Sequence, residues 1–129
     1  MMKKDIPLIP TKHGVLLDTH IVMPHRDVKG ILEYSKLHEG FIRFLITRYN
    51  RKITVLIGDI TKEGDYTDFE PNVQVYKISE DLDIAFNKNL LRILRCIDGD
   101  VEIFARSNFP MIIREIENKF GFMITPHLG

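Results

Sequence analysis

The sequence has 129 residues, of which 44% are hydrophobic, and its eighteen acidic side chains balance eighteen basic ones. Zero formal net charge argues against a whole-surface attraction to nucleic acid or to a membrane, so a charged binding site has to be a local patch. The single cysteine excludes an intramolecular disulfide and a cysteine-based zinc cluster. The length suits one hydrophobic core, and we expect residues 1–129 to form a single domain.

The N-terminal residues Met1-Met2-Lys3-Lys4 lead into Asp5 and Pro7 and not into an apolar segment, so they do not resemble a signal peptide. No apolar run in the sequence approaches the ~20 residues that are needed to cross a bilayer. These two features predict a cytoplasmic protein that makes no membrane contact.

The first two elements are indicated by hydrophobic periodicity. Residues 13–23 alternate around β-branched side chains and end before Pro24, which predicts a strand. From Asp27 onward, apolar side chains recur at helical spacing, with Asp27 as the N-cap and Gly40 as the stop signal. The sequence therefore predicts a first helix from Asp27 to about Gly40.

Residues 40–60, GFIRFLITRYNRKITVLIGDI, allow two interpretations. If the helix continues through Gly40, its apolar face extends to Tyr49, and the first six elements of the chain follow the βαββαβ order of ferredoxin-like domains. If the helix ends at Gly40, two strands form a hairpin joined through residues 49–52, with Asn50 able to adopt a positive φ. The segment is rich in Ile, Thr and Phe and lacks Ala, Glu and Gln, which favours the hairpin.

The second half of the sequence begins with a polar loop over residues 61–72 and an alternating strand over residues 73–79. Ser79 is then a suitable cap for a helix that ends at Asp98-Gly99. The apolar stripe of this helix consists of Leu82, Ala85, Phe86, Leu90, Ile93 and Ile97. Residues 100–106 are expected to form a strand.

A last helix and a last strand complete the expected elements. Ser107 or Asn108, followed by Pro110, marks the start of the helix, and Gly121 marks its end. The apolar positions of this helix are Ile112, Ile113, Ile116 and Phe120. Residues 122–125 then read as a short strand before Pro126.

This order of elements predicts an α+β fold, in which a mixed β-sheet and helices packed mainly on one face form a two-layer sandwich. A ferredoxin-like βαββαβ unit with a C-terminal αβ extension is one version of this fold, and the sequence shows no internal repeat. The expected core consists of Leu16, Ile31, Val55, Ile57, Val75, Phe86, Leu90, Ile93, Val101, Ile112, Ile113 and Ile116.

A basic, aromatic segment near the predicted hairpin turn is the strongest candidate binding site. Four cations lie within ten residues without an intervening acidic residue, and a tyrosine accompanies them. The predicted site residues are Arg43, Arg48, Tyr49, Arg51 and Lys52. Cations suit phosphates and an aromatic ring suits an unpaired base, so the pattern predicts binding of single-stranded DNA or RNA. The alternative explanation is a solvated turn whose tyrosine packs on the domain.

A metal site is the next candidate. Asp18 and His20 lie two residues apart on a predicted strand and therefore share a face, with His25 and Asp27 just beyond. These residues would supply ligands to a metal-dependent hydrolase. Their spacing matches no known metal motif, so we expect Asp18 and His20 not to form a metal site.

Other motifs give no catalytic or cofactor signature. The acidic loop that carries Asp59, Glu63, Asp65, Asp68 and Glu70 does not have EF-hand spacing. The glycines of this region do not form a phosphate-binding loop, so we expect no cofactor. The cysteine, on a predicted helix, is expected to be a buried core thiol.

The sequence therefore predicts a small, non-catalytic binding module whose partner is nucleic acid. The alternative is a protein-interaction or homodimerising accessory subunit that pairs through an exposed sheet edge or an apolar helix face. A further alternative is a metal-dependent hydrolase that uses Asp18 and His20.

Overall fold

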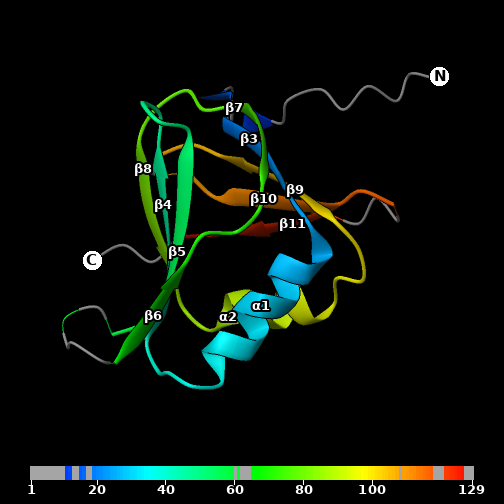
Figure 1. Ribbon diagram of the computed structural model, residues 1–129. Coiled ribbons are helices and arrows are strands. Elements are labelled where there is room, and N and C mark those ends of the chain that lie inside the picture. The colour runs from blue at the N-terminus through cyan, green and yellow to red at the C-terminus, as the bar shows by residue number, and fades with distance from the viewer. Residues whose placement is uncertain are drawn as a thin grey trace.

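The computed structural model describes residues 11–12, 15–16, 19–59, 61, 65–107, 109–117 and 121–126, with the backbone alone described at 11–12 and 15–16. Two helices and two main β-sheets lie within these residues, which confirms the predicted α+β class (Figure 1). The elements are β1 (Thr11–Lys12), β2 (Val15–Leu16), β3 (Thr19–Met23), α1 (His25–Ser35), β4 (Phe41–Thr47), β5 (Lys52–Gly58), β6 (Tyr66–Phe69), β7 (Gln74–Lys77), β8 (Leu82–Phe86), α2 (Asn89–Arg95), β9 (Val101–Ala105), β10 (Met111–Glu115) and β11 (Gly121–Ile124).

The described strands form a four-stranded sheet in the order β6-β5-β4-β8, a five-stranded sheet in the order β11-β10-β9-β3-β7, and a small β1-β2 hairpin. Every described strand pair is antiparallel, so the expectation of a mixed sheet is wrong in this detail. Figure 1 shows the helices side by side below the sheets. One core cluster joins the two sheets to both helices, because the inner side chains of each sheet pack against the apolar faces of α1 and α2.

The two halves of the chain repeat one topology. The first half is β3-α1-β4-β5-β6 and the second is β8-α2-β9-β10-β11, and the first strand of each half pairs with the strand that follows the helix of the other half. Met23 at the end of β3 lies opposite Val101, and Phe86 at the end of β8 lies opposite Ile42. The repeat is not visible in the sequence, because the equivalent strands β3 (THIVM) and β8 (LDIAF) have a single residue in common. Strand β7 is an addition to the first half.

The hairpin interpretation of residues 40–60 is confirmed. β4 and β5 pair from Phe41 opposite Gly58 to Thr47 opposite Lys52, and α1 ends at Ser35, before Gly40. The βαββαβ order that requires a long first helix is therefore wrong. Arg51, and not Asn50, has the positive φ at the turn, at 54°.

The predicted helix over residues 79–97 is instead strand β8 followed by the short helix α2. Leu82, Ile84 and Phe86 alternate toward the core at 4%, 6% and 0% exposure, as a strand requires. The side chain of Asn87 accepts a hydrogen bond from the backbone N–H of Asn89 at 2.9 Å, which forms a local turn between the strand and the helix.

The predicted last helix over residues 107–120 is also wrong where the chain is described, because residues 111–115 form strand β10. Met111, Ile113 and Glu115 are buried and alternate with half-buried Ile112 and Arg114, which is a period of two. The expected strands over residues 73–79, 100–106 and 122–125 correspond to β7, β9 and β11.

The expected core is largely confirmed. Its buried members are Ile31, Val55, Ile57, Phe86, Leu90, Val101 and Ile113. Val75 and Ile93 are partly buried and pack against the core. Ile112 is half-buried and Ile116 is 42% exposed, because both had been assigned to a helix that the chain does not form. The side chain of Leu16 lies outside the described residues.

Candidate interaction site

The β4–β5 turn presents most of the residues that the sequence singled out. Tyr49 is 96% exposed at the tip, so the alternative in which its ring packs on the domain is wrong. The Arg51 guanidinium donates a hydrogen bond to the Val75 carbonyl at 3.1 Å, and Lys52 forms a 3.1 Å ion pair with Glu70. Two of the turn cations are thus held by neighbouring segments of the chain.

Arg43, another of the four predicted cations, lies near the start of β4, away from the turn. Its guanidinium forms a 2.6 Å ion pair with the Asp83 carboxylate of β8. The backbone N–H of Arg48 donates to Asp81 at 2.7 Å, so carboxylates that precede or belong to β8 approach β4 at both ends. Arg43 lies within β4, is held in this ion pair and is therefore not part of the turn that carries Tyr49.

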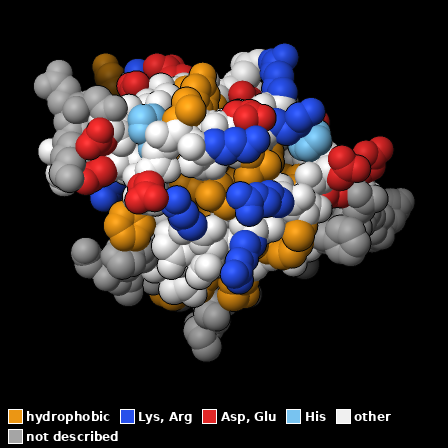
Figure 2. Space-filling view, turned by 90° about the horizontal axis from the view of Figure 1, so that it is seen from below, with side chains coloured by type: hydrophobic (Ala, Val, Ile, Leu, Met, Phe, Trp, Pro, Cys, Tyr) orange, Lys and Arg blue, Asp and Glu red, His pale blue; other side chains and the backbone are white. Residues whose placement is uncertain are grey.

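A larger gathering of Lys and Arg lies over the two helices. Figure 2 shows these side chains on the lower face of the molecule, with apolar side chains between them. The exposed cations of the helices and their flanking residues are Arg26, Lys29, Lys36, Lys88, Arg92 and Arg95. Sequence reasoning missed this face because its cations are spread over seventy residues and only the packing of α1 on α2 gathers them.

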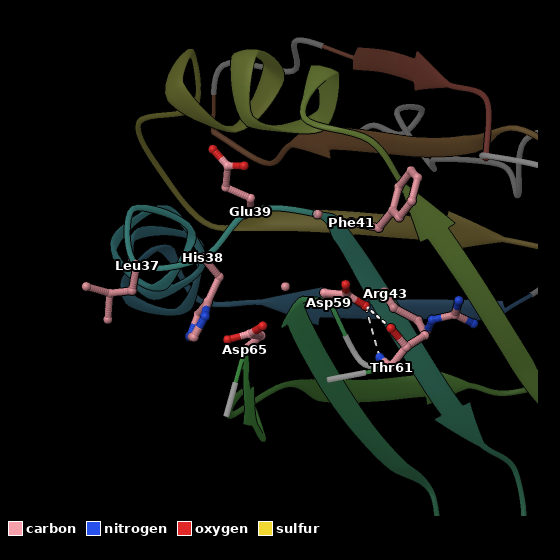
Figure 3. Close-up of a pocket in the computed structure, with 10 residues that line it drawn as sticks. Leu37, His38, Glu39, Phe41, Arg43, Asp59, Thr61 and Asp65 are labelled. Atoms are coloured by element: carbon pink, nitrogen blue, oxygen red, sulfur yellow. Dashed lines mark hydrogen bonds between the residues drawn. The ribbon is translucent and has the colours of Figure 1, made fainter. Parts of the chain in front are cut away.

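A hollow of about 620 Å³ lies where the segment after α1 enters β4 and where the end of β5 leaves the sheet (Figure 3). Its described lining residues are Leu37, His38, Glu39, Gly40, Phe41, Arg43, Gly58, Asp59, Thr61 and Asp65. Leu37 is 70% exposed and Phe41 is 39% exposed, so apolar surface faces solvent here. The hollow combines this apolar surface with three carboxylates.

Two glycines shape the floor of the hollow. Gly40 and Gly58 have φ angles of 115° and 122°, in the left-handed region that side chains rarely adopt. A Cβ on Gly40 would lie 2.9 Å from the Gly58 carbonyl carbon, and a Cβ on Gly58 would overlap the Asp65 backbone. The two backbones approach closely only because both residues are glycine.

Local hydrogen bonds fix the polar rim. The His38 Nε2 and Thr67 Oγ1 atoms lie 2.6 Å apart, which ties the segment after α1 to β6. Asp59 Oδ1 accepts hydrogen bonds from the backbone N–H and the hydroxyl of Thr61, at 3.0 and 2.6 Å (Figure 3). The Asp59 carboxylate on the rim is therefore part of a local turn.

The described residues of the metal hypothesis are not gathered into a set of metal ligands. Asp18 lies outside the described residues, and the His20 ring is stacked between Tyr76 and Phe104, with centroids 4.8 and 4.4 Å away. Asp27 accepts a hydrogen bond from the backbone of Asn72. In the part of the chain that the structure describes, no three His, Cys, Asp or Glu side chains gather closely enough to hold a metal ion. The absence of a metal site at Asp18 and His20 stays a prediction.

Two further expectations concern the acidic loop and the cysteine. Of the loop residues, Asp59 and Asp65 line the hollow, Glu70 pairs with Lys52, and Glu63 lies outside the described residues. Cys96 is exposed, so the expectation of a core thiol is wrong. It follows α2 directly, and its thiol donates to the Arg92 carbonyl at 3.3 Å.

Comparisons with known proteins give a likeness of fold. No family model and no curated protein match the chain. A DNA polymerase sliding clamp from Pseudomonas aeruginosa matches over 94% of this chain and 33% of its own, with 18% identity and a TM-score of 0.69. The DNA polymerase III subunit beta of Borrelia burgdorferi matches over 93% of this chain and 32% of its own, with 16% identity and a TM-score of 0.70.

A third solved structure, the DNA polymerase III beta subunit of Thermotoga maritima, matches over 86% of this chain and 31% of its own, with 19% identity and a TM-score of 0.67. The chain spans about a third of the length of these proteins. None of the described helices is long and apolar enough to cross a membrane.

These findings correct the leading functional interpretation. The prediction of a nucleic-acid-binding module that acts through residues 43–52 is wrong, because the whole chain shares its fold with part of a clamp subunit. At 16–19% identity, this likeness shows the fold alone. The chain therefore has the fold of the sliding clamp domains that it matches.

Proposed function

We propose that the chain is a protein-interaction domain that assembles edge to edge with other domains of the same fold. One observation carries this proposal: β6 and β11 occupy equivalent places in the repeated topology, each at the end of a sheet. Each has one neighbouring strand among the described residues. The domain thus offers two related edges, one on each sheet.

An edge strand has backbone N–H and C=O groups that pair readily with another strand. β6 and β11 are different sequences, so a contact between β11 of one copy and β6 of the next is heterologous. Repetition of such a contact gives a ring when the rotation closes and an open chain when it does not. The side chains along these edges are suited to contact, since Tyr66 is 37% exposed and Met123 is 53% exposed.

Assembly through the helix face is disfavoured by charge. The exposed face of α1 and α2 carries the six cations described above, with apolar side chains between them (Figure 2). Two copies that met through this face would place like charges together. The sheet edges are therefore the better contacts.

The comparisons support an accessory role. The matched proteins are named as sliding clamps or beta subunits of DNA polymerase III and are about three times as long as the matched region. Further copies of this chain, or further domains of the same fold, would supply as many sheet edges as a protein of that length.

Analytical ultracentrifugation over a wide range of protein concentrations tests the proposal. We expect the average mass to rise with concentration, and we expect Met123→Lys on β11 to suppress this rise because a charged edge resists pairing. Ile116→Lys is the matched control, since Ile116 is similarly exposed but follows β10 and is not part of an edge strand. A monomer at every concentration, or equal effects of both variants, would contradict edge-to-edge assembly.

The hollow supports a second candidate function, the binding of a short partner segment or small ligand. Exposed Leu37 and Phe41 beside the carboxylates of Glu39, Asp59 and Asp65 favour a ligand with an apolar group and a cation. Griselimycin, which is bound to one Pseudomonas aeruginosa clamp, is an available probe. Amide shifts at Gly40 and Gly58 on titration would support this site, and shifts confined to other regions would oppose it.

A further inference from the structure

The outer edge of β8 is the place where the two halves of the fold differ. β3 and β8 are equivalent strands, each paired with the strand after the helix of the other half. The other side of β3 is covered by β7, which runs antiparallel to it. Among the described residues, no strand covers the corresponding side of β8.

The β8 strand is firmly held by the rest of the fold. It pairs with β4 over five residues, from Leu82 opposite Ile46 to Phe86 opposite Ile42. Its core-facing side chains Leu82, Ile84 and Phe86 are at most 6% exposed. A partner strand would thus meet a preformed edge and would not have to order it.

The pairing of β7 with β3 indicates the geometry of such a partner. Ile21 lies opposite Val75, and His20 lies opposite Lys77. When the halves are aligned on Met23 and Phe86, which end the two strands, His20 corresponds to Asp83. We therefore consider a partner segment that pairs with β8 in the same way that β7 pairs with β3. In such a segment, the residue equivalent to Lys77 lies opposite Asp83.

The charge of this edge is complementary to a cation at that position. Residues 79–86 contain Glu80, Asp81 and Asp83 and no Lys, Arg or His. The Asp83 side chain is 57% exposed although one of its oxygens pairs with Arg43. We propose that the outer edge of β8 binds an extended segment of a partner protein, antiparallel to β8, with apolar residues in alternation and a Lys or Arg opposite Asp83.

The chain supplies its own probe for this proposal. A synthetic peptide with the sequence of residues 72–79, NVQVYKIS, carries the alternation and the lysine of β7. Titrated into the ¹⁵N-labelled protein, it is expected to shift the amide signals of residues 82–86. A peptide with glutamate in place of its lysine should bind up to about fivefold more weakly, which is the upper range for a cross-strand charge pair.

Two variants of the protein sharpen the test. Asp83→Lys should reverse the preference between the two peptides, and Asp83→Asn should abolish the preference while keeping the shape of the side chain. Asp68→Asn is the matched control, because Asp68 is an exposed aspartate on β6 at the opposite edge of the same sheet. This control should keep the wild-type preference for the lysine peptide.

Several results would overturn the proposal. One is that no amide signal shifts at the highest peptide concentration that stays in solution. Another is that the shifts centre on residues 19–23, because the peptide displaces β7. The third is that the Asp83→Lys variant keeps the wild-type preference between the two peptides. The proposal is independent of edge-to-edge assembly, since Met123→Lys should leave peptide binding unchanged. A failure of either idea is therefore distinguishable from a failure of the other.

Discussion

The His20 Nε2 atom lies 2.9 Å from Glu102 Oε2, across the pairing of β3 with β9. The other Glu102 oxygen accepts hydrogen bonds from Nε and a terminal nitrogen of Arg114 on β10, at 3.2 and 3.1 Å. One carboxylate thus joins three strands on the outer face of the five-stranded sheet. The His20 ring also stacks on Phe104, which is 1% exposed yet lies outside the main core cluster.

We expect Glu102→Gln to lower the free energy of unfolding by about 1–2 kcal/mol, because the charged acceptor receives two hydrogen bonds from Arg114 and its side chain is only 14% exposed. Urea denaturation at neutral pH measures the change. Glu33→Gln is the control: its side chain is 70% exposed, it pairs with Lys36 at the C-terminal end of α1, and its loss should cost at most about 0.5 kcal/mol. Equal effects would show that the outer-face network contributes no special stability.

Leu90→Ala should destabilise the protein by about 2–5 kcal/mol, because Leu90 is fully buried and its truncation leaves a cavity between α2 and the sheets. Thermal and urea unfolding of the purified variant check this value. Leu37→Ala removes the same atoms from a side chain that is 70% exposed, and it should change stability by less than about 0.5 kcal/mol. A small effect at Leu90 would contradict the packing of α2.

Two Gly→Ala substitutions are expected to have opposite signs. Gly58→Ala should cost more than about 1 kcal/mol, since the residue has a φ of 122° and the new Cβ would meet the backbone of Asp65 and Tyr66. Gly30→Ala in α1 should instead stabilise the protein by about 0.5–1 kcal/mol, because alanine favours a helix and its Cβ would make only ordinary contacts with Phe69. Melting temperatures that move in the same direction would refute this difference.

Two exposed tyrosines differ in whether the ring contacts another side chain, so their removal should affect stability differently. Tyr76→Ala should cost about 0.5–1.5 kcal/mol because its ring stacks on His20, at an interplanar angle of 21°. Tyr49→Ala should be close to neutral, since the Tyr49 side chain is 96% exposed. Chemical denaturation of both variants in one buffer makes the comparison. A larger loss for Tyr49→Ala would place its ring against the domain.

The local patterns of the sequence were sufficient for α1, for the β4–β5 hairpin and for most of the core. They failed over residues 79–97 because Leu82, Phe86, Leu90 and Ile93 fit a helical stripe as well as a strand followed by a helix. The strand and the helix are separated by a turn at Asn87. A single polar residue within a continuous apolar stripe is not enough to predict such a turn.

Strand β10 was missed for a different reason. One of its three inward positions is Glu115, which is 1% exposed and accepts a hydrogen bond from the backbone N–H of Asp98 at 2.8 Å. An apolar pattern cannot find a buried carboxylate whose partner comes from another loop. The cations of the helix face were missed similarly, because only tertiary packing brings α1 and α2 together.

The exchange of β3 and β8 between the two sheets has a consequence for how the chain acquires its structure. Neither half can complete its own sheet alone, because residues as far apart as His20 and Glu102, separated by 82 positions, must meet first. So many non-local pairings imply slow folding, and they imply that both halves gain and lose structure in one cooperative step. A polypeptide cut between β7 and β8 should yield two fragments that are unfolded apart and that regain the native spectrum when mixed.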